Sequence, residues 1–415
     1  MVSLIVAGIR DLASILRGNV GIMALSWFLF GLSGALVFPF FTLYAKALRA
    51  DDFSIAFIRS IGMYLLAFFT IIGGFLTDYF GRVRVIIFGT SLITIIQYLY
   101  AFVRDWTQLA ILWIIDEVAH FYQPALTAII MDSLPRDKTL RGFLVLQVFP
   151  SIPWLFMPIV GGILWDKLGI TGIRIGFIVA GTISAIVVFL RIKGLRETLI
   201  RTSTPRVYEF LKDIAKYRKH LVKALYVYLF TGFLVPLVNS VSQIYGPIYV
   251  VEVLGGTRTD WGLLTSIGTA FGMATGIALA VRRNINELSV LLLGVLSLSF
   301  SQIVFAVPGY LGMYDPIVVG IAVCIGGIST SLIWPATSAL LTYILPLEIR
   351  GRATGFQRMI ENIGLATTSI IAGLLYTRLG PANSLLVSGL IGISLIIYIY
   401  HMYMITHHYK SNSSQ

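Results

Sequence analysis

Charged residues and cysteine are scarce in this chain of 415 residues. Charged side chains make up only 12% of it, and the single cysteine, Cys324, can form no intrachain disulfide. Hydrophobic residues account for 57% of the chain, and the mean hydropathy is +0.87. This composition excludes a water-soluble domain and predicts an integral membrane protein.

The sequence also lacks the signatures of common catalytic and nucleotide sites. It contains no G-x-x-x-x-G-K-[S/T] loop and no G-x-S-x-G elbow, and only His407 and His408 stand at a spacing that suits a metal. We therefore predict no cofactor, no metal and no nucleotide-driven pumping.

Twelve apolar stretches are long enough to cross a bilayer, which requires about 20 residues each. An even number places both termini on one side of the membrane. The predicted spans are 20–45, 54–76, 84–103, 107–131, 142–165, 172–192, 222–250, 260–281, 288–308, 316–344, 354–376 and 381–406.

Lysine and arginine indicate which side that is. Of the 31 basic residues, 23 fall at the termini or in the loops on the same side as the termini. The positive-inside rule therefore predicts a multi-pass protein of the plasma membrane with both termini cytoplasmic. The net charge of +12 follows from this bias, so we expect no nucleic acid partner.

The one long polar connection divides the chain. Ten basic residues lie between Arg191 and Lys223, and residues 208–217 alternate apolar and charged positions at helical spacing. We predict an N-terminal six-helix bundle at 1–192, a cytoplasmic linker with an amphipathic helix at 193–221, and a C-terminal six-helix bundle at 222–415.

An internal repeat relates the two halves. A shift of 211 residues aligns 123–125 with 334–336, the Leu-Pro pair at 134 with that at 345, and 161–169 with 372–380. Three anchors at one offset indicate a duplicated unit. We expect an all-α membrane fold of two pseudo-symmetric bundles with a cavity between them.

A loop between the second and third spans carries a recognisable pattern. From Gly74 to Arg84 the chain reads G-x-L-x-D-x-x-G-R-x-R, with Asp78, Gly81 and Arg82 in the fixed positions. The glycines at 73, 74 and 81 permit close helix contact and a tight reversal. This pattern resembles the signature of the major facilitator superfamily. The resemblance implies twelve helices in two six-helix bundles and an inner gate that would join Asp78, Arg82 and Arg84 to the start of the eleventh helix, including Arg350 and Glu361.

The fifth span carries a second, partial match. Pro158, Gly161 and Gly162 resemble the P-x-x-G-G part of a motif associated with proton-coupled drug exporters of that superfamily. Pro153 and Met157 stand where the fuller motif has glycines. The prolines predict a bent helix, and a helix that is merely kinked for packing explains the pattern equally well.

Ionisable residues within the fourth span are candidates for chemistry, because charge is costly in a bilayer. Asp116, His120, Gln123 and Thr127 share one helical stripe, which we expect to face the cavity. Glu117 lies about 100° away and is expected to meet a neighbouring helix. Asp116, Glu117 and His120 are therefore predicted to carry protons. The alternative is an acid neutralised by Arg59 or His120 that serves packing only.

Polar and aromatic residues of other spans are predicted to line a substrate cavity. The seventh span has Pro236 and Pro247 among amides, which suggests a broken polar segment of the kind that lines binding sites. The predicted lining residues are Thr42, Arg59, Gln123, Asn239, Gln243, Tyr245 and Trp334.

These observations predict a secondary active transporter rather than an enzyme, working as a monomer in the lipid bilayer. We expect proton-coupled export of a small organic solute. Uptake of a sugar or organic acid is a close alternative. A lipid-modifying enzyme that uses Asp116, Glu117 and His120 as acid-base groups, and a passive channel, are alternatives of other classes.

Overall fold

The computed structural model describes residues 16–134, 146, 148–199, 218–282, 286–345 and 350–412. Within these residues the regular structure is helical and no strand occurs, so the predicted all-α class is confirmed. The first half contains α2 (Gly18–Val37), α3 (Phe41–Ala47), α4 (Asp52–Phe80), α5 (Arg82–Tyr100), α6 (Trp106–Ala119), α7 (Gln123–Ser133), α9 (Met157–Leu168) and α10 (Ile170–Gly194). The second half contains α12 (Arg218–Leu229), α13 (Val235–Ile248), α14 (Arg258–Val281), α15 (Glu287–Leu311), α16 (Pro316–Ile344), α17 (Arg350–Leu379) and α18 (Pro381–Asn412).

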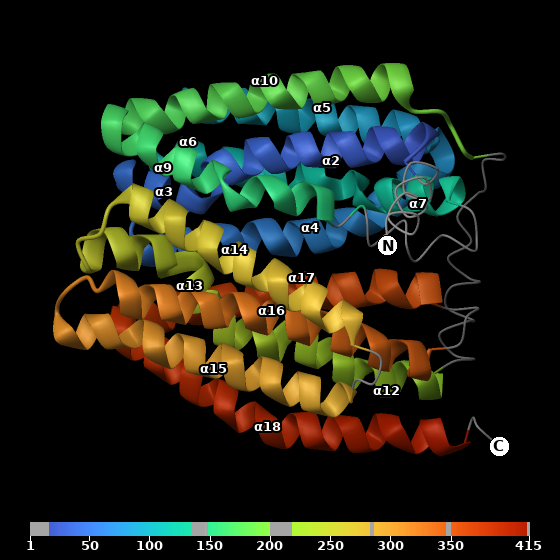
Figure 1. Ribbon diagram of the computed structural model, residues 1–415. Coiled ribbons are helices and arrows are strands. Elements are labelled where there is room, and N and C mark those ends of the chain that lie inside the picture. The colour runs from blue at the N-terminus through green and yellow to red at the C-terminus, as the bar shows by residue number, and fades with distance from the viewer. Residues whose placement is uncertain are drawn as a thin grey trace, which may run out of the picture.

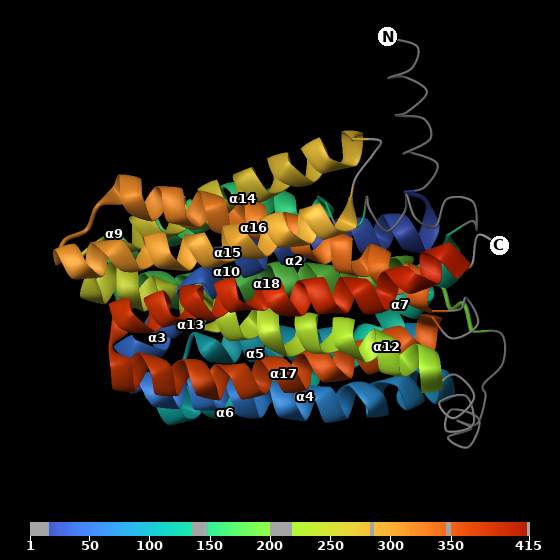
Figure 2. The same ribbon diagram turned by 90° about the horizontal axis from the view of Figure 1, so that it is seen from below.

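The helices form two bundles that lie side by side (Figure 1). In the first, α2 packs against α10; in the second, α15 packs against α16 and α18. Helix α2 begins and α18 ends at the same end of the bundles, on the right in Figure 1 and Figure 2. We call this the terminal end and the other the opposite end. This placement agrees with an even number of spans.

Eleven helices of the described chain are long and apolar enough to cross a membrane. They coincide with eleven of the twelve predicted spans, and the remaining one, 107–131, is found as α6 followed by α7. The predicted start of the fifth span, 142–145, and the predicted linker helix, 208–217, lie outside the described residues.

The fourth span is split because of one proline. Pro124 has no N–H to donate to the carbonyl of His120, so the regular hydrogen bonding is interrupted there. A short 3₁₀ segment, His120–Tyr122, joins α6 to α7 at this point. The fifth span is also interrupted, with a 3₁₀ segment at Ile152–Leu155 before α9, which confirms the predicted bend.

The seventh span was expected to break, but the structure keeps it continuous. Residues Phe230–Leu234 and Tyr249–Val253 form π-helical turns on either side of α13. Pro236 has no N–H to donate to the carbonyl of Gly232. The backbone widens into a π turn at this position, so the helix continues although that hydrogen bond is missing. The prolines therefore distort this helix without ending it.

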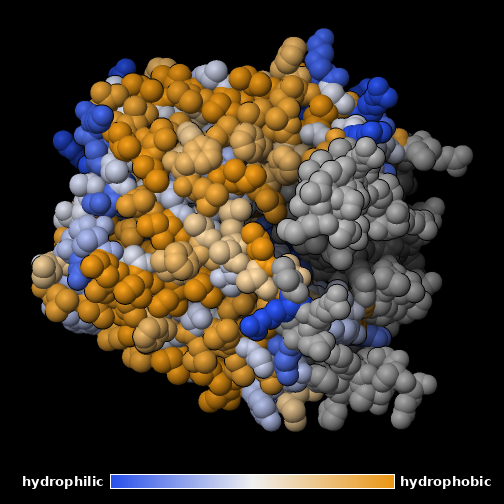
Figure 3. All heavy atoms as spheres, in the orientation of Figure 1, coloured by the Kyte–Doolittle hydropathy of each residue, from blue (hydrophilic) through white to orange (hydrophobic). Residues whose placement is uncertain are grey.

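The outer surface is apolar, as a bilayer requires. Large side chains such as Ile397 and Ile317 are 78% and 72% exposed. Hydrophobic residues cover the middle of the face in Figure 3, and hydrophilic residues gather toward the opposite end. A surface of this kind is stable only in contact with lipid.

The two halves are joined toward the opposite end. Helix α4 packs along α17, and α9 packs along α14. The carboxylate of Asp166 accepts hydrogen bonds from the Thr259 backbone N–H at 2.8 Å and from its hydroxyl at 2.6 Å, and it lies 3.4 Å from the Arg258 guanidinium. We call Asp166, Arg258 and Thr259 the cross-half latch. The Trp261 indole N–H adds a bond to the Pro39 carbonyl at 2.8 Å.

A side chain at position 162 should loosen this interface. A Cβ on Gly162 would lie 2.5 Å from the Arg258 carbonyl oxygen, so Gly162→Val must push α9 from α14. We expect a loss of about 1–3 kcal/mol in stability, measured as a lower thermal unfolding midpoint in detergent. Gly320→Val is the control, because a Cβ there meets no atom within 4 Å. Equal midpoints for the two variants would contradict the prediction.

Candidate functional site

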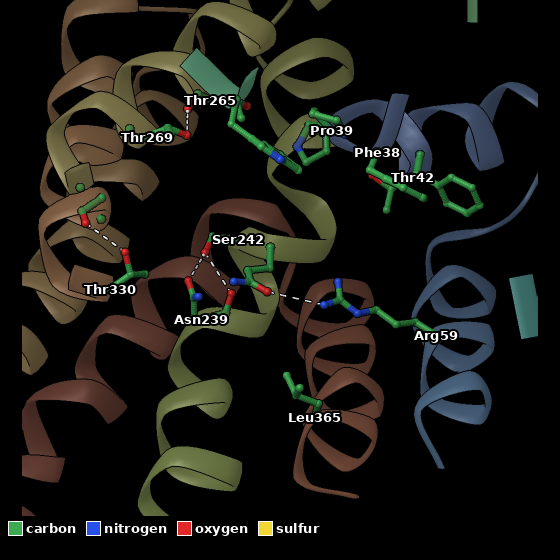
Figure 4. Close-up of a pocket in the computed structure, with 18 of the residues that line it drawn as sticks. Phe38, Pro39, Thr42, Arg59, Asn239, Ser242, Thr265, Thr269, Thr330 and Leu365 are labelled. Atoms are coloured by element: carbon green, nitrogen blue, oxygen red, sulfur yellow. Dashed lines mark hydrogen bonds between the residues drawn. The ribbon is translucent and has the colours of Figure 1, made fainter. Parts of the chain in front are cut away.

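A cavity of about 1020 Å³ lies between the two halves. Its size suits a small organic molecule. Residues of α4 and α6 line it from the first half, and residues of α13 to α17 line it from the second. Figure 4 shows Arg59 of α4 facing Asn239 and Ser242 of α13, with Thr265 and Thr269 of α14 on another wall.

Asp116 is the most buried ionisable group among the residues of the first half that line the cavity. The residue is 5% exposed, and its Oδ2 accepts a hydrogen bond from the Tyr100 hydroxyl at 3.2 Å. Its Oδ1 has no hydrogen-bond partner within the described part of the chain. The His120 ring nitrogen Nδ1 lies 2.7 Å from the Asp116 carbonyl oxygen, because the two residues are one helical turn apart. One carboxylate oxygen is thus left for water, a proton or a ligand.

Glu117 faces both a neighbouring helix and the cavity. Its Oε1 accepts a hydrogen bond from the Trp113 indole N–H at 3.2 Å. A Cβ on Gly62 of α4 would lie 2.8 Å from the Glu117 Cγ, so the side chain packs closely against that helix. The expected contact with a neighbouring helix is confirmed, and the residue also lines the cavity.

Arg59 links the two halves across the cavity. Its Nη2 donates to Oε1 of Gln243 at 3.5 Å, the dashed bond that ends at Arg59 in Figure 4. Its guanidinium also lies within electrostatic range of Glu117. One arginine therefore joins an acid of the first half to an amide of the second.

Most of the residues predicted for the cavity line it. Thr42, Arg59, Gln123, Asn239 and Gln243 do so, together with Asp116, Glu117 and His120.

Two predicted cavity residues, Tyr245 and Trp334, do not line it. Tyr245 is 1% exposed, with its ring stacked 3.9 Å from that of Tyr376 and its hydroxyl bonded to the Asp52 carbonyl. Trp334 lies outside the wall, with the Arg358 guanidinium 5.3 Å from its ring. An aromatic residue in a membrane helix packs against other helices as readily as it lines a cavity. The prediction that Tyr245 and Trp334 line the cavity was therefore wrong.

Several lining residues were missed by the sequence reasoning. Trp261, Thr265 and Thr269 follow one another at four-residue spacing on α14 and all line the cavity. This spacing could have indicated from the sequence that the three side chains share one face of a helix. Gln302 of α15 also lines it, and its Oε1 has no protein partner. A lone amide in an apolar span carries no periodic signal.

The signature loop turns as the glycines predict, with one exception. Gly81 adopts φ of +92°, which favours glycine, and directly precedes α5. Gly73 lies against the carbonyl oxygen of Phe121, so its close contact is confirmed. Gly74 was also expected in close contact, but a Cβ there would meet no atom within 4 Å.

The charges of this loop find partners within the first half. Arg82 forms an ion pair with Asp132 of α7, and it donates to the Thr198 hydroxyl at 2.8 Å. Asp78 lies within electrostatic range of Arg82. Arg84 is exposed.

The predicted partners in the eleventh helix are placed differently. Glu361 accepts hydrogen bonds from Thr231 at 3.3 Å and from Gln357 at 2.8 Å, and it lies 3.4 Å from the Arg358 guanidinium. All three donors belong to the second half, so in this conformation Glu361 is not paired with the signature loop. The side chain of Arg350 lies outside the described residues.

Glu197, which the sequence reasoning assigned only to the linker, anchors the loop. Its carboxylate accepts from the backbone N–H groups of Arg82 at 3.2 Å and Val83 at 3.0 Å, at the start of α5. Partial burial acts to raise the pKa of Glu197, but these bonds and those from the N–H groups of Thr198 and Leu199 outweigh it and hold the pKa below its usual value. A carboxylate at a helix N-terminus is favourable because it meets free N–H groups and the positive end of the dipole.

Comparisons with known proteins agree with this geometry. The family model described as Major Facilitator Superfamily matches residues 23–323 and 289–415. The multi-drug resistance efflux pump PmrA of Streptococcus pneumoniae is 24% identical over 358 residues, covering 84% of this chain and 86% of the pump. The multidrug resistance protein MdtG of Rahnella is 21% identical over 387 residues, covering 88% of each. A crystal structure of the peptide transporter POT with sulfate superposes with a TM-score of 0.75 at 16% identity, covering 95% of this chain and 96% of that one, which supports the fold alone.

Removing the Glu197 charge should destabilise the start of α5. We expect Glu197→Gln to lower the unfolding free energy by about 0.5–1 kcal/mol, because the helix N-terminus loses an anionic cap. Since the folded-state pKa is lowered, the contribution is present above the usual glutamate pKa of about 4.3 and is lost as the pH falls through the folded value. Thermal unfolding of wild type and variant at pH 7 and at pH 3 checks this. A difference between the two proteins that is as large at pH 3 as at pH 7 would contradict it.

Proposed function

Because the chain belongs to the Major Facilitator Superfamily, we propose that it exports a small organic solute across the membrane in exchange for protons. The observation that carries the proposal is the cavity between the halves, with both carboxylates, Asp116 and Glu117, on one wall, and amides together with Arg358 on the other. The efflux pumps among its relatives support export as the direction. The family consists of transporters, so the prediction that the chain is not an enzyme is confirmed.

Proton coupling would act through the acids of the fourth span. An ionised Glu117 attracts Arg59, whereas a protonated Glu117 leaves the guanidinium to its bond with Gln243 of the other half. Proton binding would thus change a bond that crosses between the halves. Asp116 would exchange a proton at its free Oδ1, with His120 one turn away on the same wall.

Alternating access would be a rocking of residues 1–192 against 222–415 about the cavity, with 193–221 as the connecting linker. The cross-half latch joins the halves at the opposite end and would hold that end closed in this conformation. If the terminal end is cytoplasmic, as the basic residues predict, this conformation faces inward. In the outward-facing conformation, Asp78, Arg82 and Arg84 would meet the start of α17, with Arg350 and Glu361.

The lining indicates a moderately hydrophobic solute. Phe38, Trp113 and Trp261 provide aromatic surface, and Asn239 and Gln243 provide hydrogen-bond donors and acceptors. A few polar groups in an otherwise apolar wall orient a ligand without binding it too tightly to release. A single chain contains the whole cavity, so we propose a monomer in the plasma membrane. Uptake of a sugar or organic acid would use the same cavity in the other direction.

Neutralising both acids should abolish coupling. We expect the double variant Asp116→Asn, Glu117→Gln to lose solute-induced proton movement in liposomes with an imposed pH gradient and an internal pH dye. The solutes are supplied as mixed pools of organic compounds. Asp105→Asn is the matched control, because Asp105 only caps the start of α6. Gradient-driven flux that survives in the double variant would exclude these acids as the proton carriers.

Weakening the cross-half latch should expose the cavity from outside. In a Cys324→Ser background carrying Thr265→Cys as a reporter in the cavity wall, we expect Asp166→Asn to raise labelling by an external, membrane-impermeant maleimide several-fold. Asp315→Asn is the control, because Asp315 caps α16 within its own half. Unchanged labelling of the Asp166 variant would show that the latch does not hold this end closed.

A further inference from the structure

A second cavity of about 600 Å³ lies inside the first half. Its walls come from α2, α5, α6, α7 and α10, with the 3₁₀ segment Ile152–Leu155. It adjoins the central cavity, because the two share Phe38, Asp116, His120, Ser151 and Trp154 as lining residues. A solute in the central cavity therefore borders this side cavity directly.

Arg191 of α10 is the basic side chain that distinguishes the side cavity. The residue is 0% exposed, and its Nη1 donates to the Thr90 hydroxyl. Its Nε and Nη2 have no hydrogen-bond partner among the residues that the structure describes. No carboxylate within the described chain forms an ion pair with it, and the Tyr122 hydroxyl is its other polar neighbour. The Phe30 ring lies 5.1 Å from the guanidinium carbon.

The rule that basic residues gather on the cytoplasmic side of a membrane protein does not explain why Arg191 is buried. Lys193, two residues further along the same last turn of α10, is exposed and supplies positive charge at the membrane surface. Burial of a guanidinium is unfavourable unless the group is paired and fully hydrogen-bonded. Intramembrane charges that lack a protein partner usually mark a ligand or ion path.

The free part of the guanidinium has a definite shape. Nε and Nη2 lie next to each other and form one edge of the planar group, and two parallel N–H bonds from such an edge match the two oxygens of a carboxylate. Trp27, Phe30 and Trp154 line the same cavity with aromatic surface. The arrangement matches an acid group attached to an apolar body.

We propose that the side cavity is an anion subsite in which Arg191 binds the carboxylate of an aromatic or apolar organic acid. This deepens the proposed function, because it names the class of solute, and it rests on that function for the route by which the acid arrives. An organic acid would reach Arg191 past Asp116 and His120, which line both cavities. Binding itself needs no gradient and no turnover.

Equilibrium binding to the full chain in detergent tests the proposal. The probes are 2-naphthoate and its neutral analogue 2-naphthamide, followed by tryptophan fluorescence and by calorimetric titration. We expect the wild type to bind the acid at least about 10-fold more tightly than the amide, since a bidentate charged pair replaces neutral contacts.

Substitutions at position 191 test whether Arg191 is the source of the preference for the acid. We expect Arg191→Gln to weaken naphthoate binding by about 10-fold to 100-fold and naphthamide binding by a much smaller factor, so that the preference for the acid is lost. Arg191→Lys keeps the positive charge but lacks the two parallel N–H donors, and it should retain part of the preference for the acid. A partial preference in this variant would show that the protein still folds and binds with a substitution at position 191. Lys193→Gln, two residues away and exposed, should behave as wild type.

Several outcomes would overturn the proposal. These are equal affinity of the wild type for both probes, no binding of naphthoate, or an acid preference that survives in Arg191→Gln. The binding result is separate from transport. A protein that prefers the acid through Arg191 but moves no proton would contradict the proposed coupling and leave the anion subsite in place.

Discussion

Hydrocarbon solvates neither a free backbone polar group nor an unpaired charge, and this constraint shapes the whole molecule. Helices satisfy their own backbone groups, so the spans are helical. Charged side chains inside the spans are then tolerated only on interior walls. Asp116, Glu117 and Arg59 meet at one cavity, Arg191 lines a second, and Glu361 is held by three donors of its own half.

The same constraint explains where the helices are irregular. The 3₁₀ segment at His120–Tyr122 follows from Pro124, and it lies at the wall of both cavities. A carbonyl that loses its donor to proline needs another partner. The His120 carbonyl accepts from the Gln123 backbone N–H in the 3₁₀ segment. At the π turn near Pro236 the backbone of Gly232 lies against the helix of Glu361. The irregular turns thus lie where two helices or a cavity meet.

Much of this architecture could be predicted from sequence, because bilayer thickness fixes the length of an apolar span. The twelve spans follow from composition, and a period of 3.6 residues places Asp116, His120 and Gln123 on the cavity wall. Thr127, predicted for the same stripe, does not line the cavity. Contacts between distant segments could not be predicted in this way. The bond of Asp166 to Thr259, the capping of α5 by Glu197, and the burial of Arg191 depend on how the helices are assembled. Aromatic residues were the least predictable, since Tyr245 and Trp334 pack outside the cavity while Trp261 lines it.

The acids that line the cavity belong to one half of the protein. The first half contributes both carboxylates, whereas the second contributes amides and hydroxyls such as Gln243 and Thr265, together with the guanidinium of Arg358. Amides, hydroxyls and a guanidinium keep their charge near neutral pH, so under the proposed coupling a change in protonation would act first on the half that holds the acids. The bond from Arg59 to Gln243 would carry such a change to the other half. An arrangement with acids on both walls would need two protonation events to achieve the same effect, whereas here a single bond would connect the charge state of the first half to its contact with the second.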